Sequence, residues 1–210
     1  MKLFQCEAIP VNILATIAEF HYLHLVANQK ISLNGLTSAS LALVDAHGFG
    51  ALNLSSVAAE LDVGPSALYT HVDGVAGLRY LVAVASTLEL TDGVRNAAIG
   101  VSGHEALRAM GHAYRAFAHE YPGRFASTLL PPTSDDSRLA NANESLVDVF
   151  TIVYRAMGLE PHADRTAARC CRSAIHGFLA LEHSTGTSLA HDAEFMHLLG
   201  ALALGLAPGL

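Results

Sequence analysis

The chain has no tryptophan, only three cysteines, and no apolar run long enough to cross a membrane. Its longest apolar stretch, Leu198 to Leu210, is too short for a span and contains glycine and proline. The cysteine number is odd, and Cys170 and Cys171 are adjacent, which disfavours an ordinary bridge between them. We therefore expect reduced thiols, a cytoplasmic protein and no membrane partner.

Charge is scarce as well. Charged residues make up 15% of the sequence and apolar residues 51%, with a formal net charge of −7. The Val/Ile alternation of strands is nearly absent, whereas Ala and Leu recur at helical spacing. This pattern predicts an all-α fold. With 210 residues, the chain can form one or two small domains with a real core.

The most informative segment is residues 52–78, which the pattern predicts to be two short helices joined by a tight turn. Such a unit presents one helix to the DNA major groove. We expect Ser55 to cap the first helix. Pro65 suits the first position of the second helix, which would run to His71 and end at Asp73-Gly74. The apolar face of the first helix consists of Val57, Ala58 and Leu61.

The segment LSSVAAELDVGPSALYTHVDG resembles the helix-turn-helix of the TetR family of bacterial transcriptional regulators. That family's pattern is a series of LT, VA or IA, L-G-V and LY-x-H. It occurs here as Leu54-Ser55, Val57-Ala58, Leu61-Asp62-Val63 and Leu68-Tyr69-Thr70-His71.

The second half of the chain carries a further resemblance. Residues 100–128 and 169–182 resemble the C-terminal domain of a TetR subgroup named for a Trp-His-Gly motif. Ile175-His176-Gly177 occupies that motif, with Ile in place of Trp. Together the blocks cover roughly residues 36–206 and occur in the family's order.

The resemblance implies an all-helical, TetR-like protein in three parts. These are an N-terminal extension (1–35), a helix-turn-helix DNA-binding domain (36–80), and an effector-binding and dimerisation domain (81–210). It also implies a transcription regulator rather than an enzyme, with no cofactor and no metal. The commonest mode in such proteins is a repressor that a small apolar effector releases from double-stranded operator DNA.

Hydroxyl groups dominate the expected recognition helix. Ser66, Tyr69 and Thr70 could reach base edges or phosphates there. Ser55 could offer its helix-start amide to a phosphate, and the resemblance gives Tyr69 and His71 contacts with the DNA backbone. Alternatively, Tyr69 is a half-buried packing residue and Ser55 only a cap. The predicted DNA-binding set is Ser55, Ser66, Tyr69, Thr70 and His71.

This DNA-facing segment has few cations. Between residues 36 and 80, Arg79 is the single Lys or Arg. It is opposed by four acids, Asp45, Glu60, Asp62 and Asp73. Lys and Arg supply most non-specific DNA affinity, so we expect weaker, salt-sensitive binding. The alternative is a dimeric small-molecule sensor or interaction module whose DNA-binding motif has decayed.

Further helices follow from capping signals and periodicity. Residues 11–27 form either an extra helix or a poorly ordered extension. Thr37 or Ser38 should cap the next helix, which ends at His47, and Ser102 with Glu105 forms a capping box. The other expected helices span residues 75–98, 102–121, about 122–130, 137–157, 161–183 and 192–206.

The last two helices carry apolar stripes. The first begins at Ala167 and Cys171, and the second at Phe195. Doubled by a two-fold axis, the stripes would make a four-helix dimer interface, although both could equally face the chain's own core. The resemblance favours a homodimer. The predicted interface consists of Ala174, Phe178, Leu181, Phe195, Leu199, Leu202 and Leu206.

Aromatic and histidine side chains in the second half predict an apolar effector pocket with a few polar groups. Ordinary bundle core is the alternative. Twelve histidines also raise a zinc enzyme or hydrolase as a rival, but they match no recognised ligand pattern. The predicted pocket consists of His112, Tyr114, Phe117, Tyr121, Tyr154, His176 and Phe178.

Overall fold

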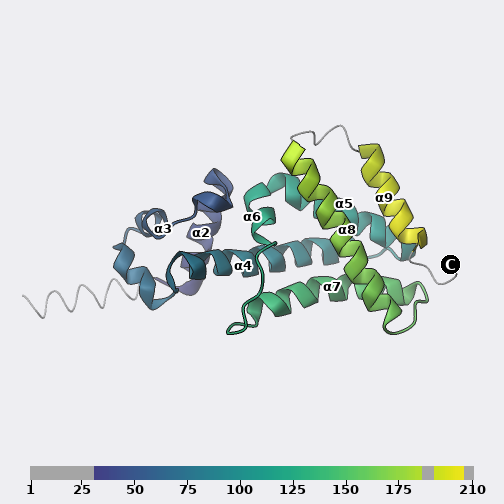
Figure 1. The fold of residues 1–210 in the computed structure, drawn as a ribbon, viewed down its shortest axis with the longest axis horizontal. Coiled ribbons are helices and arrows are strands. Elements are labelled where there is room, and N and C mark those ends of the chain that lie inside the picture. Colours follow the sequence, from purple (N-terminus) through teal and green to yellow (C-terminus); the bar gives the residue numbers. More distant parts are fainter. Residues whose placement is uncertain (1–30, 186–191, 206–210) are drawn as a thin grey trace, which may run out of the picture.

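A computed structural model describes residues 31–185 and 192–205, and every regular element within these ranges is a helix. The long helix α4 (Gly74–Ala97) runs through the middle of the molecule. Helices α2 (Leu33–His47) and α3 (Leu54–Glu60) lie at one end (Figure 1). The predicted all-α fold is confirmed. The helix expected at residues 11–27 lies outside the described residues.

The remaining elements complete a helical bundle around α4. They are η1 (Phe49–Ala51), η2 (Pro65–Thr70), α5 (Gly103–Glu120), α6 (Pro122–Ser127), α7 (Arg138–Ala156), α8 (Ala163–Thr185) and α9 (Asp192–Gly205). Apart from the start of α2 and the short η1, which was not predicted, these bounds agree with the predicted helices to within about three residues.

The first helix begins earlier than predicted. Ser32 caps α2 by accepting a hydrogen bond from the Gly35 amide at 3.0 Å. Neither Thr37 nor Ser38 is a cap, because both lie within the helix. The Thr37 hydroxyl donates instead to the Leu33 carbonyl, at 2.7 Å.

Two other capping predictions are also wrong in detail. Asn53 caps α3, since its side chain accepts from the Ser56 amide at 2.9 Å, and Ser55 is the second residue of the helix. Ser102 does precede α5, but its side chain makes no capping hydrogen bond, so the predicted box with Glu105 is not formed. Asparagine caps as well as serine does, so sequence alone could not choose between neighbouring candidates.

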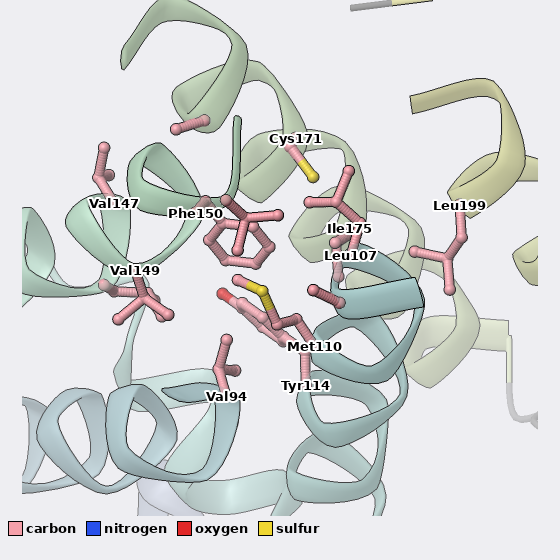
Figure 2. Packing of buried hydrophobic residues seen from close by; sticks show 14 of the residues in the cluster. Val94, Leu107, Met110, Tyr114, Val147, Val149, Phe150, Cys171, Ile175 and Leu199 are labelled. Atoms are coloured by element: carbon pink, nitrogen blue, oxygen red, sulfur yellow. The ribbon is translucent and has the colours of Figure 1, made fainter. Parts of the chain in front are cut away.

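Two large apolar clusters make up most of the core of the described residues, and α4 contributes to both. The N-terminal cluster joins α2, α3, η2 and the first part of α4, and includes Leu36, Val57, Leu68, Leu78 and Val82. The C-terminal cluster joins the end of α4 to α5, α7, α8 and α9, and includes Val94, Met110, Phe150, Ile175 and Leu199 (Figure 2). Fully burying each such side chain contributes about 1.5–3 kcal/mol.

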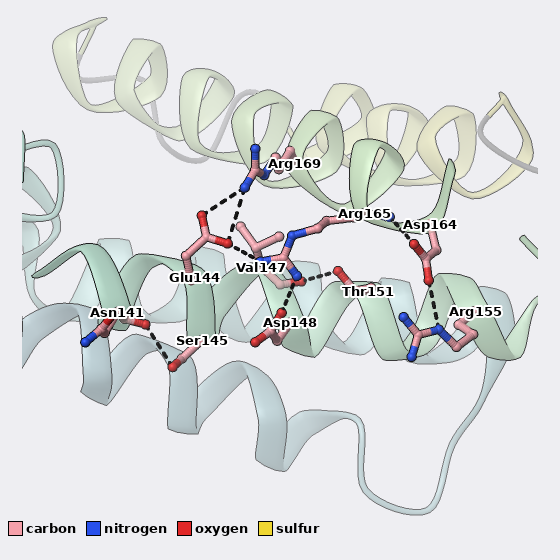
Figure 3. Close-up of polar contacts among 10 residues, drawn as sticks. All are labelled: Asn141, Glu144, Ser145, Val147, Asp148, Thr151, Arg155, Asp164, Arg165 and Arg169. Atoms are coloured by element: carbon pink, nitrogen blue, oxygen red, sulfur yellow. Dashed lines mark hydrogen bonds and ion pairs between the residues drawn. The ribbon is translucent and has the colours of Figure 1, made fainter. Parts of the chain in front are cut away.

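Helices α7 and α8 are also linked by ion pairs along their outer edge (Figure 3). Arg165 pairs with Glu144 and, at 2.6 Å, with Asp148. At the other end, Arg155 Nε lies 2.8 Å from a carboxylate oxygen of Asp164, whose side chain is buried. Exposed pairs contribute little stability, so the apolar core remains the main force holding α7 against α8.

The short helix α6 connects the C-terminal bundle to α2. Gly123 packs so closely on α2 that a Cβ atom there would lie 2.6 Å from the Val44 carbonyl oxygen. Arg124, the next residue, pairs with Asp45 of α2 and with Glu89 of α4, each at 2.5 Å. This contact, the α2–α6 latch, fixes the N-terminal helices against the bundle.

Replacing Gly123 with alanine tests the latch. Backbone cannot yield as a flexible side chain does, so we expect Gly123→Ala to lower the free energy of unfolding by about 1–3 kcal/mol. Gly93→Ala is the matched control. Gly93 is exposed within α4 and its added Cβ would touch nothing, so stability should rise by up to about 1 kcal/mol. Urea denaturation measures both, and equal effects would contradict the close approach.

Candidate nucleic-acid interface

The helix-turn-helix segment is built on a small buried core. Val57 and Ala58 of α3 and Leu68 of η2 are fully buried, each at most 1% exposed. Between the helices, Asp62 adopts a left-handed backbone with φ of 54°. Asp62 occupies the glycine position of the family pattern, and aspartate tolerates this conformation better than most residues. The predicted two-helix unit with a tight turn is therefore present.

The second element of this unit differs from the expected α-helix. Residues 65–70 form a single 3₁₀ stretch, with Pro65 at its start as predicted. The Thr70 hydroxyl donates to the Ala67 carbonyl at 2.9 Å, within this stretch. The tighter winding brings side chains three residues apart onto one face, which places Ser66 and Tyr69 side by side along η2.

The predicted DNA-binding residues lie mostly on the outside. Ser55, Ser66 and Thr70 are exposed, and Tyr69 is 62% exposed, so Tyr69 is not the half-buried packing residue of the alternative interpretation. Within the described residues, the hydroxyls of Ser55, Ser66 and Tyr69 make no side-chain hydrogen bond. His71 differs, because it is half-buried and its Nε2 atom is buried without a partner.

The helix-turn-helix end of the molecule carries less uncompensated negative charge than the count of acids between residues 36 and 80 indicates. Asp45 is one of the four acids between residues 36 and 80, and it is held by Arg124 in the α2–α6 latch. Arg79, the single Lys or Arg of that segment, is half-buried, with its guanidinium carbon 5.9 Å from the centre of the Phe49 ring. Arg79 is therefore set back from the exposed hydroxyl face.

In the C-terminal bundle, the structure joins two of the predicted effector residues directly. The Tyr114 hydroxyl and His176 Nδ1 are 3.0 Å apart, and the His176 ring stacks on Phe125 at 4.4 Å between centres. Burial, helped by nearby Arg172, lowers the pKa of His176 to about 4, and burial raises the pKa of Tyr114 to about 12. Both groups are therefore neutral near pH 7.

The other predicted effector residues are dispersed around this pair. Tyr154 is fully buried and donates to the Leu202 carbonyl at 3.2 Å, with its pKa raised chiefly by burial. Phe117, Tyr121 and Phe178 are half-buried, and His112 is exposed. The predicted pocket is thus a packed core around Tyr114 and His176, with the remaining residues towards its edge.

A buried charge cluster beside this core was missed from the sequence. Glu182 of α8 is almost fully buried and pairs with Arg115 at 2.5 Å and with His119 at 3.0 Å. Arg115 also reaches Asp192 of α9, at 2.6 Å. Burial disfavours the Glu182 carboxylate, but the bonds from Arg115 and His119 outweigh it and hold its pKa below the usual value. The only sequence hint to this cluster was the spacing of Arg115 and His119, which lie four residues apart and therefore share one face of α5.

The two apolar stripes of α8 and α9 turn largely inwards. Phe195 and Leu199 are at most 4% exposed within the single chain, as are Ala167 and Cys171. Ala174, Phe178 and Leu202 are half-buried, Leu181 is 69% exposed, and Leu206 lies outside the described residues. For the most buried members, the structure therefore favours the own-core alternative that the sequence left open.

Among the hollows lined by described residues are three that contain none of the predicted effector residues. The largest, of about 760 Å³, lies beside the start of α4. The others, of about 240 and 190 Å³, lie at the α4–α5–α7 end and between α5 and α9.

Residues 31–185 and 192–205 contain neither a cluster of metal-ligating side chains nor a helix suited to a membrane. The histidines, cysteines and acids there form no group of three or more that could hold a metal ion. No helix in these ranges combines the length and apolar character that crossing a membrane requires.

The low pKa of His176 predicts a pH-dependent stability. The unfolded chain takes up a proton near pH 6.5, whereas folded His176 does so only near pH 4. Its contribution is therefore complete above pH 6.5 and is lost as pH falls towards 4. When the pH falls from 7 to 4.5, the unfolding free energy of the parent should therefore decrease by about 2–3 kcal/mol more than that of His176→Phe. Denaturant titrations at both pH values measure this. Exposed His104→Gln is the control, and parallel losses in H176F and parent would contradict the buried neutral histidine.

Comparison with known proteins agrees with this architecture. Residues 107–202 match the family described as tetracyclin repressor-like, C-terminal domain. The uncharacterized HTH-type transcriptional regulator Rv0681 of Mycobacterium tuberculosis is 29% identical over 84% of this chain and 82% of its own length. YobS of Bacillus subtilis, another uncharacterized HTH-type regulator, is 28% identical over 70% of this chain and 76% of its own.

Solved structures show the same fold. BioQ of Mycobacterium smegmatis superposes with a TM-score of 0.66 at 22% identity, covering 84% of this chain and 98% of BioQ. A structure of BioQ with its double-stranded DNA operator gives 0.64, also at 22% identity, and covers 85% and 99%. Residues 107–202 therefore form a tetracyclin repressor-like C-terminal domain, and the chain is similar in sequence to two HTH-type transcriptional regulators and in fold to BioQ.

Proposed function

We propose that this protein binds double-stranded operator DNA as a homodimer and is released by a small apolar effector, acting as a repressor in the cytoplasm. The observation that carries the proposal is the exposed hydroxyl face of α3 and η2, held rigid by buried Val57 and Leu68. A likeness in fold to BioQ, which was crystallised with its DNA operator, supports it.

The DNA contacts are assigned from exposure and hydrogen-bonding capacity. Tyr69, Ser66 and Ser55 present hydroxyls that can donate to phosphate oxygens or pair with base edges. Thr70 stands next to them and is also exposed. His71 is half-buried, so its contact with the DNA backbone is the least direct of the predicted set. The contacts are mostly neutral, so phosphate binding here relies on hydrogen bonds more than on ion pairs.

The rival function is a dimeric small-molecule sensor without DNA binding, and the shortage of cations favours it. Non-specific affinity falls with each phosphate left without a cation. Titration of the purified protein with fluorescent DNA from upstream of its own gene, at low salt, separates the two. Saturable binding that unlabelled upstream DNA displaces better than random DNA supports the regulator. No binding, with an intact dimer, supports the sensor.

The effector is proposed to bind in the core around Tyr114 and His176. His176 Nε2 is buried with no hydrogen-bond partner, while its Nδ1 faces the Tyr114 hydroxyl. A ligand that supplies a partner for Nε2 would therefore be favoured. We further infer that Ile175-His176-Gly177 places the domain in the Trp-His-Gly subgroup. An effector that binds the DNA-free arrangement better would shift the population off the operator.

The dimer is proposed to form through the outward faces of α8 and α9. Gly177 and Gly200 lie on these helices, and a Cβ atom at either would meet nothing within 4 Å. Leu204 and Met196 of α9 are 69% and 38% exposed. Glycines at open positions let a second pair of helices approach closely, and the leucine and methionine supply apolar area for it to cover. This interface is rotated away from the stripe through Phe195 and Leu199.

Removing the exposed aromatic ring tests the DNA face. Tyr69→Ala should weaken upstream DNA binding about tenfold or more, since a phosphate or base contact is lost, with unchanged thermal stability because Tyr69 is largely exposed. Tyr69→Phe separates the hydroxyl from the ring. Leu129→Ala, also 62% exposed but on the segment after α6, is the control. Equal DNA affinity in Y69A and parent would refute the assigned contact.

A charge placed on the outward face of α9 tests the dimer. Leu204→Glu should convert dimer to monomer, because a carboxylate would be buried without a partner at the interface. Ile152→Glu on α7, at a side chain 65% exposed, should leave the mass unchanged. Light scattering coupled to size-exclusion chromatography gives the mass of each variant. A dimer of unchanged strength in L204E would place the interface elsewhere.

A further inference from the structure

The largest of the three hollows described above lies where the N-terminal helices meet the rest of the chain. Its volume is about 760 Å³, within the range of small-molecule sites. Its walls come from the turn after η2, the first turns of α4, and the loop between α6 and α7. Leu33, Val75, Leu130 and Pro131 give it apolar surface. We call it the α4 hollow.

Two residues that line the α4 hollow carry buried nitrogen atoms with no hydrogen-bond partner. They are Arg79, through Nε, and His71, through Nε2. The structure shows no carboxylate paired with Arg79 within the described residues, and its neighbour is the Phe49 ring. Buried polar groups are almost always satisfied in folded proteins. A cation left partly buried without an acceptor therefore favours a ligand that brings one.

The start of α4 adds further donors beside the same hollow. Asp73 is the N-cap residue of this 24-residue helix, but its side chain makes no capping hydrogen bond. The amide groups of the first turn are therefore not capped by a side chain, and together they carry a partial positive charge that favours anions. Asp73, Val75 and Ala76 all line the hollow.

The carboxylates of the lining do not reverse this preference. Asp136 is held by Arg138, whose Nε lies 2.9 Å from Asp136 Oδ2, so that pair is neutral overall. Asp135 accepts from the Ser134 hydroxyl at 2.9 Å. Asp135 and Asp73 are both exposed, so water and salt screen their repulsion. Arg79 is less exposed than either, and its charge is the least screened.

We propose that the α4 hollow binds a small organic anion with an apolar body, of the medium-chain carboxylate class. The carboxylate accepts hydrogen bonds from Arg79, His71 and the first amides of α4, and the apolar chain covers Leu130 and Pro131. This site is separate from the Tyr114–His176 core. The ligand would bridge the turn after η2 and the loop before α7, and so set the angle of the DNA-facing unit. That regulatory consequence rests on the proposed function, whereas anion binding itself does not.

Isothermal titration of the full chain with octanoate, in the absence of DNA, tests the site. Octan-1-ol and octyltrimethylammonium are probes of the same chain length without the negative charge. We expect octanoate to bind, and Arg79→Met to weaken its affinity at least about tenfold, the scale of one charge-assisted hydrogen bond. Arg95→Met, at an exposed residue near the other end of α4, is the matched control and should bind octanoate as the parent does.

A second variant fills the space without removing charge. Ala76 is exposed on α4 and lines the hollow, so Ala76→Trp should fold normally, as circular dichroism can verify, and bind octanoate more weakly. The proposal is overturned if octanoate does not bind, if both R79M and A76W bind it as the parent does, or if either uncharged or cationic probe binds as tightly. A protein that binds octanoate at this site but no DNA would refute the proposed function and leave the site standing.

Discussion

The fold depends on one helix belonging to two apolar clusters at once. The first half of α4 packs Leu78 and Val82 against α2 and η2, and the second half packs Leu90 and Val94 against the C-terminal bundle. At 1.5 Å per residue, this 24-residue helix is about 36 Å long. Because packed side chains leave little free space, a shift of the far end of α4 would be transmitted to the helix-turn-helix unit.

The α2–α6 latch gives that transmission a second point of support. A unit attached at a single contact can rotate about it. The N-terminal helices are attached at two, through α4 and through the latch, so their rotation is restricted. Gly123 makes the contact by bringing backbone against backbone, and Arg124 fixes its direction through Asp45 and Glu89. The Tyr114–His176 core lies on α5 and α8, and α5 leads directly into α6. A ligand in that core would thus act close to the latch.

Much of the fold could be predicted from the sequence, because apolar periodicity indicates helices and breaks such as Pro122-Gly123 and Gly158 indicate their ends. The all-helical fold and the tight turn before Pro65 follow from local pattern, whereas the pattern left half-burial of Tyr69 open as an alternative. The helix caps could not be predicted in this way. Ser32, Asn53 and Ser55 have similar capping chemistry, and only the three-dimensional context selects among such residues. The Arg115–Glu182 pair joins residues far apart in the chain, which local pattern cannot show. The inward turn of Phe195 and Leu199 was undecidable, because α9 is apolar on more than one face.

The pairing of Arg124 with Asp45 would affect how the protein dissociates from a DNA duplex. While the latch is closed, the Arg124 guanidinium offsets part of the negative charge of Asp45 on α2, because it is shared with Glu89. Opening the latch would uncover that carboxylate as well as free the unit to rotate. Displacement and repulsion from the phosphodiester chain would then act in the same direction, so a small movement of α6 could change affinity more than its size alone implies.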